Sequence, residues 1–457
     1  MFYVLDTLAY GICFKTPQGD VEHRSTGMGF VDDVTLGCTE KNPIKNNDDI
    51  LETDNDRTKK VCKQITSMAQ HWEKMLFADG GRLELKKCYW ILISWKWIRG
   101  IAVMQTNEET PWEMNLHQSE ADQTVTITRQ TIKAAPKVLG CHIAVDGNSE
   151  KEFGRWRTEA IRFGTKVKKA KFKRTCGEKI YPTIWIPKLR YISAPVCFTR
   201  EQCETIDKKV VRHCVSASGY HKGLPRAVLY GPSQYGGTEW DTSYLLQVYE
   251  KVRFFLGHVR RNDRLGKLLV ILVQTIQLVA GINDQILDTE IKWTTWVETT
   301  WITFLQTCLW EVNGRIKLEC KKYKCPRKQD QFIMDIFEKE KYSKKKLLAI
   351  NRCRIYLRVL TVSDLCTYDG RDIESTIWSL EKGRHSTMQW PIQIKPCKTD
   401  INIWKKAIKS LVIGSDTLRN PLGEWISKTH QTWRYMSNKN KTVLLRCENG
   451  VQKKWLG

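Results

Sequence analysis

The stretch that decides the fold is Met28-Gly29-Phe30-Val31-Asp32-Asp33-Val34-Thr35-Leu36, in which two adjacent carboxylates lie between two short apolar runs. The β-branched and aromatic residues on both sides favour extended backbone, and aspartate is well tolerated in turns. The stretch therefore predicts a strand, a tight turn that carries the acids, and a returning strand. Such a turn would hold two carboxylates close enough to share a divalent cation, and hard ions such as Mg²⁺ prefer oxygen ligands.

The alternative for this pair is an ordinary solvated turn. The chain contains a second pair, Asp48-Asp49, in the polar run that begins at Lys45. No apolar strand precedes that second pair, and we assign it no function. Taken alone, Asp32-Asp33 leaves both interpretations open.

The composition points to a polyanionic partner. The 457 residues include 74 Lys and Arg against 50 Asp and Glu, a formal net charge of +24. Such an excess suits nucleic acid or an anionic surface, although a solvated basic surface without a partner is the alternative. The 16 cysteines are scattered, and no signal peptide is visible at Met1, so we expect an intracellular protein, in nucleus or cytoplasm, that is not secreted. The apolar run 268–273 is too short to span a membrane, and we expect no membrane partner.

Apolar spacing and turn residues divide the rest of the chain into expected elements. We expect an apolar helix tail over 1–14. Further helices are predicted at 58–79, 166–174, 203–215, 243–258, 266–280 and 295–312, the last with a capping box of Thr295 and Glu298. Strands are predicted at 89–95, 124–128 and 137–145.

Three of these pieces carry motifs in a fixed order. The first is Gly29-Phe30-Val31-Asp32-Asp33, the second is the helix 58–79 followed by Gly80-Gly81-Arg82-Leu83-Glu84-Leu85-Lys86-Lys87-Cys88, and the third is Val138-Leu139-Gly140. In this order the chain resembles the later half of the reverse transcriptase of a eukaryotic retroelement. The pieces look like the aromatic-x-Asp-Asp hairpin of the palm, the next palm motif Gly-x-Leu-x-x-x-Lys-Cys, and the hairpin that joins palm to thumb.

The resemblance implies an RNA-directed DNA polymerase, a nucleotidyltransferase of retrotransposon type. It would use two Mg²⁺ or Mn²⁺ ions, deoxynucleoside triphosphates and an RNA or DNA primer-template. Asp32 and Asp33 would be metal ligands. Lys87 would protonate the leaving pyrophosphate, the alternative being a solvated charge at a strand end.

The resemblance also implies parts that the chain does not show. The family needs another aspartate on an earlier strand, and basic fingers that grip the triphosphate, and both would precede residue 1. Two adjacent acids do not complete a two-metal site, so we expect a truncated protein that is inactive or very weak alone. A weaker hypothesis is a permuted polymerase, in which a strand at 355–364 brings Asp364 beside Asp32. The sequence also leaves open a non-catalytic nucleic-acid-binding protein and a decayed reading frame.

Basic clusters at 166–174, 317–328 and 339–346 are the expected nucleic-acid contacts, because lysine and arginine bind phosphates without reading sequence. The residues assigned this role are Lys166, Lys168, Lys169, Lys171, Lys173, Arg174, Lys321 and Lys322. A solvated charged face is the alternative. Trp72, Trp156 and Trp185 could stack on bases, but we expect the core to contain them.

The expected fold class is α+β. We predict a partial polymerase palm over 1–100, with an antiparallel hairpin sheet and helices, and a palm-to-thumb hairpin region over 101–150. A basic, mainly helical thumb-like region would follow over 151–290, and a small mixed C-terminal region over 291–457.

Overall fold

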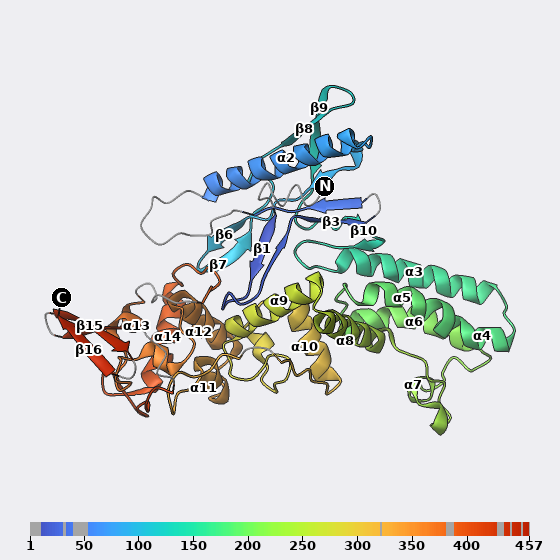
Figure 1. Cartoon of the computed structure of the whole chain (residues 1–457). Coiled ribbons are helices and arrows are strands. Elements are labelled where there is room, and N and C mark those ends of the chain that lie inside the picture. Colours follow the sequence, from blue (N-terminus) through green and yellow to red (C-terminus); the bar gives the residue numbers. More distant parts are fainter. Residues whose placement is uncertain are drawn as a thin grey trace. The chain divides into compact units, whose positions relative to one another are not determined.

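A computed structural model describes residues 11–30, 33–39, 54–319, 322–380, 388–426, 434–438, 441–448 and 451–456. The chain forms two compact units (Figure 1). The first comprises Met1–Phe14, His23–Lys96 and Met104–Leu269, and the second comprises Lys15–Glu22, Trp97–Val103 and Val270–Gly457. Both combine helices with small sheets, so the expected mixture of helix and sheet is confirmed at that level. The four predicted domain ranges stay a prediction.

The helices of the described residues have the following bounds. They are α2 (Asp54–Ala78), α3 (Glu150–Lys169), α4 (Arg174–Ile180), α5 (Ile186–Ser193), α6 (Arg200–Ala217), α7 (Arg226–Tyr230), α8 (Ser243–Arg261), α9 (Arg264–Ala280), α10 (Trp301–Glu311), α11 (Ile333–Lys339), α12 (Lys344–Leu357), α13 (Ser375–Ser379) and α14 (Lys398–Ser410). A π-helical turn, Tyr181–Trp185, joins α4 to α5, and short 3₁₀ turns occur at Leu85–Lys87, Ser233–Tyr235, Trp293–Thr295 and Val362–Leu365.

The strands form pairs and triplets. They are β1 (Ile12–Lys15), β2 (Glu22–Ser25), β3 (Gly27–Phe30), β4 (Asp33–Leu36), β5 (Tyr89–Trp90), β6 (Trp95–Ile98), β7 (Ile101–Met104), β8 (Met114–Gln118), β9 (Gln123–Arg129), β10 (Lys137–Val138), β11 (Cys141–His142), β12 (Val412–Ile413), β13 (Thr417–Leu418), β14 (Arg434–Asn438), β15 (Lys441–Glu448) and β16 (Val451–Leu456). The three-stranded sheets have the orders β5-β9-β8 and β14-β15-β16, and the other strands pair with their sequence neighbours.

The predicted hairpin around the acidic pair is confirmed. Strands β3 and β4 are antiparallel, and Phe30 lies opposite Asp33. Only two residues can therefore form the connection, as the sequence indicated. Leu36, at the end of β4, and Cys38, just after it, pack against the α2 cluster of Met68 and Trp72, which anchors the hairpin to α2.

The core beside this hairpin lies between α2 and the sheet β5-β9-β8. Strand β9 is antiparallel to β8 and parallel to β5. The apolar face of α2 contributes Cys62, and the sheet and the segment before it contribute Leu85, Trp90, Leu92, Met114, Leu116 and Ile127. The predictions of a helix at 58–79 and a strand at 124–128 are confirmed by α2 and β9.

Helices α3 to α8 form the other part of the first unit, drawn in green in Figure 1. Helix α3 packs along α6, and their approach depends on Gly164. A Cβ added at Gly164 would lie 2.5 Å from the Lys209 carbonyl oxygen on α6. Trp156 and Trp185 are 2 % and 0 % exposed, and Trp72 is 7 % exposed, so the core contains all three tryptophans, as expected.

Gly164→Ala is expected to lower the free energy of unfolding by about 2 kcal/mol, because the added methyl group forces α3 and α6 apart. Gly154→Ala, in the same helix, is the matched control, since a Cβ there meets nothing within 4 Å. That change should instead stabilise the helix by about 0.5–1 kcal/mol. Urea unfolding followed by circular dichroism measures both, and equal effects at the two positions would contradict the close contact.

A buried carboxylate links α6 to the start of α8. Asp207 accepts hydrogen bonds from the Ser243 backbone N–H at 3.0 Å and from the Ser243 hydroxyl. Burial raises the pKa of Asp207 to about 6, although these hydrogen bonds and the charge of Arg226 oppose the shift. Between about pH 4 and about pH 6, the folded chain therefore holds a proton on Asp207 that the unfolded chain has already lost.

The free energy of unfolding should consequently fall as the pH rises from about 4 to about 6, by at most about 3 kcal/mol from this residue. Asp207→Asn should flatten that part of the profile, because the amide accepts from the Ser243 N–H and donates to its hydroxyl at every pH. Urea titrations of both proteins between pH 4 and 7 measure the difference. Parallel profiles would show that Asp207 is ionised in the folded chain.

In the second unit, a buried arginine holds the end of α9. Arg354 of α12 is 0 % exposed and donates to the carbonyl oxygens of Leu278, Val279 and Val359 at 2.8, 2.6 and 3.3 Å. Its guanidinium also donates to the Asn351 side chain. The adjacent core contains Leu278, Tyr323, Phe332 and Leu360.

Several expected elements differ from the structure. Residues 12–15 form the strand β1 rather than a helix tail, because they pair with β2. The single strand expected at 89–95 is instead β5 and the start of β6. The last helix expected from 295 begins at Trp301, with Thr300 and Thr303 as its capping box, and Thr295 ends a 3₁₀ turn.

Candidate nucleic-acid interface

The carboxylate site is only partly described. Asp32 lies outside the described residues, and the structure gives the backbone of Asp33, at the start of β4, without its side chain. The hairpin register places Asp32 in the connection and Asp33 directly after it. Carboxylate oxygens suit Mg²⁺ or Mn²⁺, so the chemistry of this pair fits the expected ions. Among the residues with described side chains, no group of three or more histidine, cysteine, aspartate or glutamate residues could hold a metal.

The second motif packs beside the first. Leu83 packs against the same α2 cluster, Met68 and Trp72, as Leu36 of the hairpin does. Two residues further, Leu85 begins a 3₁₀ turn and is buried in the sheet core, and Lys87 ends that turn with its side chain exposed. The structure therefore brings the hairpin and the Leu83 motif to one helix, and it leaves the Lys87 side chain in solvent.

The third motif is a hairpin rather than the single strand expected at 137–145. Strands β10 and β11 have two residues each, and Val138 lies opposite Cys141. Leu139 and Gly140 form the turn with φ values of 46° and 86°. Glycine takes such a conformation at little cost and leucine does not, while the Tyr191 hydroxyl on α5 donates to the Leu139 carbonyl oxygen. The hairpin is thus fixed against the helices that follow it.

A dense cluster of positive charge in the first unit lies where α3 ends. The residues that the sequence predicted as phosphate contacts are all exposed here: Lys166, Lys168, Lys169, Lys171, Lys173 and Arg174. They do not form the one helix expected at 166–174, because α3 ends at Lys169 and α4 begins at Arg174. Lys171 in the connection has a φ of 46°, which breaks the helix.

Helix α6 adds further cations to this cluster. His213 of α6 lies against α3, since a Cβ at Gly164 would come 2.8 Å from its ring. Partial burial lowers the pKa of His213, and the charges of Arg212, Lys168 and Lys222 lower it further. The three cations therefore all act electrostatically on one imidazole. We define the α3–α6 basic surface as Lys166, Lys168, Lys169, Lys171, Lys173, Arg174, Arg212 and Lys222.

Most of this charge is uncompensated. Arg174 forms an ion pair with Glu178 at 3.3 Å, and its guanidinium lies 5.3 Å from the centre of the Tyr220 ring. No described carboxylate pairs with the five lysines between 166 and 173. Repulsion among such cations is relieved when phosphate groups lie between them, so the surface is suited to a polyanion.

Sequence reasoning missed Arg212 and Lys222 as members of this surface. A signal existed for Arg212, because Lys208 precedes it by four residues, one helical turn. No sequence signal connects Lys222 to residue 168. The common effect of the two lysines on His213 depends on the packing of α3 along α6.

The basic cluster of the second unit is divided between surface and interior. Lys321 lies outside the described residues, and Lys322 is exposed. Arg327 is 6 % exposed and donates to the carbonyl oxygens of Gly423, Tyr368 and Asp369 at 2.7, 2.7 and 3.0 Å. The expectation that the whole cluster 317–328 contacts nucleic acid is therefore wrong for Arg327, which ties the second unit together. In the third cluster, Lys344, Lys345 and Lys346 are exposed at the start of α12.

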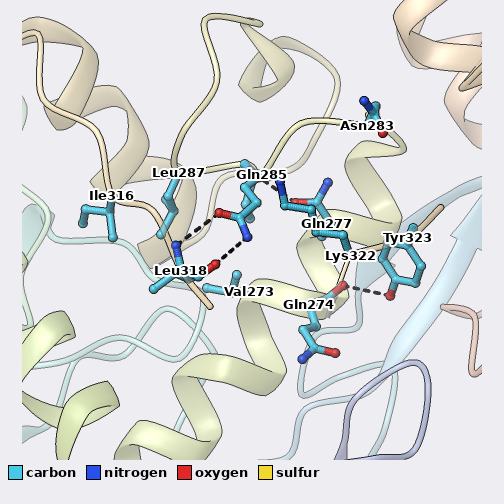
Figure 2. A pocket seen from close by; sticks show the side chains of 11 residues that line it. Val273, Gln274, Gln277, Asn283, Gln285, Leu287, Ile316, Leu318, Lys322 and Tyr323 are labelled. Atoms are coloured by element: carbon cyan, nitrogen blue, oxygen red, sulfur yellow. Dashed lines mark hydrogen bonds between the residues drawn. The ribbon is translucent and has the colours of Figure 1, made fainter. Parts of the chain in front are cut away.

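Lys322 also borders a small cavity of the second unit (Figure 2). Its walls are held by hydrogen bonds between the Gln285 side chain and the Leu318 backbone at 2.6 and 3.1 Å. The Tyr323 hydroxyl donates to the Gln274 carbonyl oxygen at 3.4 Å. About 20 Å³ is open to the centre of a water molecule, which is room for about one water. The cavity is too small for a nucleotide.

The strand that the permuted arrangement requires before Asp364 is not formed. Residues 355–357 end the helix α12 instead of forming a strand. The Asp364 carboxylate accepts hydrogen bonds from the backbone N–H groups of Leu360 and Thr361 at 2.8 and 3.0 Å. These contacts stabilise the 3₁₀ turn Val362–Leu365, so Asp364 has a structural role.

Comparisons of this chain with protein-family models, curated proteins and solved structures found no match. In the described residues, no helix combines the length and the hydropathy that a bilayer crossing requires. The cysteines with described side chains are free thiols.

Proposed function

We propose that this chain is a reverse-transcriptase-like protein of a retroelement, and that its α3–α6 basic surface binds the phosphate backbone of a primer-template. The observation that carries the proposal is the cluster of exposed lysines at the end of α3, none of which pairs with a described carboxylate. Arg212 of α6 and Lys222 extend this cluster, since their charges and that of Lys168 all lower the pKa of His213. A surface of this kind binds phosphates independently of sequence.

The hairpin β3–β4, α2 and the segment through Leu83 support the palm part of this proposal, because they pack together. Asp32 and Asp33 would hold Mg²⁺ or Mn²⁺, which supplies Lewis-acid stabilisation to a transferred phosphoryl group when it is bound. Lys87, exposed after the buried Leu85, could donate a proton to a leaving pyrophosphate. Two adjacent carboxylates do not complete a two-metal site, so polymerase activity would require a further acidic ligand.

The second candidate function is nucleic-acid binding without catalysis. It is favoured by the composition of the α3–α6 basic surface, which includes none of the polymerase candidates Asp32, Asp33 or Lys87. Binding could therefore persist in a chain that has no competent metal site.

Two measurements on the full chain test these functions. Fluorescence anisotropy with a labelled RNA-DNA primer-template should show affinity that falls steeply with salt. Primer extension with deoxynucleoside triphosphates and Mg²⁺ or Mn²⁺, lost in Asp32→Ala, would support the polymerase. Salt-dependent binding that is unchanged in Asp32→Ala, without primer extension, would support nucleic-acid binding without catalysis. Affinity that does not respond to salt would contradict both.

A further inference from the structure

A groove of about 520 Å³ lies in the first unit between α2 and β8. This volume falls within the range of sites that bind small molecules and peptide side chains. One wall is a polar flank of α2 and the other is the β8 segment. The lining residues are Lys63, Thr66, Ser67, Gln70, His71, Lys74, Trp112, Glu113 and Asn115.

The groove follows the free edge of a sheet. In the order β5-β9-β8, only one side of β8 is paired with a strand among the described residues, and Figure 1 shows α2 beside β8 and β9. The outer side of β8 is partly closed by two side chains of α2. The Gln70 amide donates to the His117 carbonyl oxygen and accepts from the His117 N–H, both at 2.8 Å. Glu73 accepts from the Ser119 N–H and hydroxyl, also at 2.8 Å.

These contacts determine where the next backbone groups point. In an antiparallel strand, the N–H and C=O of one residue point to the same side, and successive residues alternate. His117 and Ser119 point toward α2, so Asn115, two residues before His117, points to the same side. Asn115 also lines the groove. Its N–H and C=O are therefore offered to the groove at the place where the Gln70 and Glu73 contacts stop.

The opposite wall is positively charged. Lys63, Ser67, His71 and Lys74 form an exposed row along α2. No described carboxylate pairs with Lys63 or Lys74, and Glu113 is the single acidic residue of the lining. Lys63 and Lys74 are about 16 Å apart along the axis of α2. This distance is the length of about five residues of extended chain.

We propose that this groove binds an acidic peptide segment in extended conformation, which adds to the edge of β8 at Asn115. The peptide backbone would exchange hydrogen bonds with the Asn115 N–H and C=O, as in other cases of strand addition. Its carboxylates would meet Lys63 and Lys74. A nucleic acid strand fits the charge of this groove. Its sugar-phosphate backbone has no N–H group, however, so it could not donate a hydrogen bond to the Asn115 C=O. Trp112 also packs against the sheet core, so it is a poor platform for stacking a base.

The test uses fluorescence anisotropy of the full chain with a fluorescein-labelled hexapeptide of alternating glutamate and valine. The double variant Lys63→Glu/Lys74→Glu should weaken binding by roughly tenfold or more. The matched control, Lys86→Glu/Lys133→Glu, makes the same change in net charge at exposed residues outside the groove lining and should bind as the unmodified chain does. Because all four lysines are exposed, circular dichroism should show an unchanged fold.

A second probe separates strand addition from simple charge attraction. The same hexapeptide with N-methyl groups on alternate amides keeps its charge but loses hydrogen-bond donors, and it should bind at least roughly tenfold more weakly. Equal binding of the methylated peptide would overturn the proposal. Two further results would overturn it: no binding of the unmodified peptide, or tighter binding of hexathymidylate that is weakened by the groove variant and not by its control.

Discussion

Charge reversal at Lys168, Arg212 and Lys222 together is expected to weaken primer-template binding roughly a hundredfold at about 0.15 M salt. The reason is that three cations of the α3–α6 basic surface, all of which act electrostatically on His213, would no longer release counterions from the duplex. The slope of log affinity against log salt should become shallower by about 3. Anisotropy titrations at several salt concentrations measure both quantities.

The control for this prediction is a triple reversal at Lys405, Lys406 and Lys409 of α14, which are exposed in the second unit. It changes the net charge by the same amount and should leave the slope nearly unchanged. If both triple variants lose affinity equally, the chain binds through its total charge, and the α3–α6 basic surface has no special role.

Arg354→Met is expected to lower the free energy of unfolding of the second unit by about 3–5 kcal/mol. The methionine fills most of the space but leaves the carbonyl oxygens of Leu278, Val279 and Val359 buried without their donor. Arg354→Lys should be almost as damaging, because an ammonium group cannot reproduce the planar set of donors. Burial lowers the pKa of Arg354 to about 9, because the charged guanidinium has lost its contact with water.

Hydrogen exchange of the backbone amides near the end of α9 measures this effect locally, beside urea unfolding of the whole chain. Lys344→Met is the matched control, because Lys344 is an exposed residue of the same helix. Unchanged exchange in Arg354→Met would show that Arg354 does not hold the end of α9.

The sequence predicted best those elements whose pattern is local. The hairpin at Asp32-Asp33 was found because β-branched runs flank a turn, and α2 because its apolar residues recur at helical spacing. The helices expected at 203–215, 243–258 and 266–280 correspond to α6, α8 and α9. Each of these predictions depends on neighbours within a few residues, which is the range that a single sequence reveals.

The errors have a common physical cause in longer-range contacts. Residues 12–15 pair with β2, which turns an apolar segment into a strand. Arg327 was grouped with surface lysines, but three carbonyl oxygens more than 40 residues away draw it into the interior. Lys222 was overlooked for the converse reason, because only the packing of α3 along α6 allows Lys168 and Lys222 to act on the same histidine, His213.

The buried guanidinium of Arg354 also has a consequence for the order in which the chain is made. Its acceptors Leu278 and Val279 precede it by 76 and 75 residues. Since a chain is synthesised from its N-terminus, the last carbonyl groups of α9 must stay hydrated until residue 354 leaves the ribosome. In a chain released before that point, these carbonyl oxygens would lack the hydrogen bonds that Arg354 donates. The second unit can therefore reach its final structure only late in synthesis.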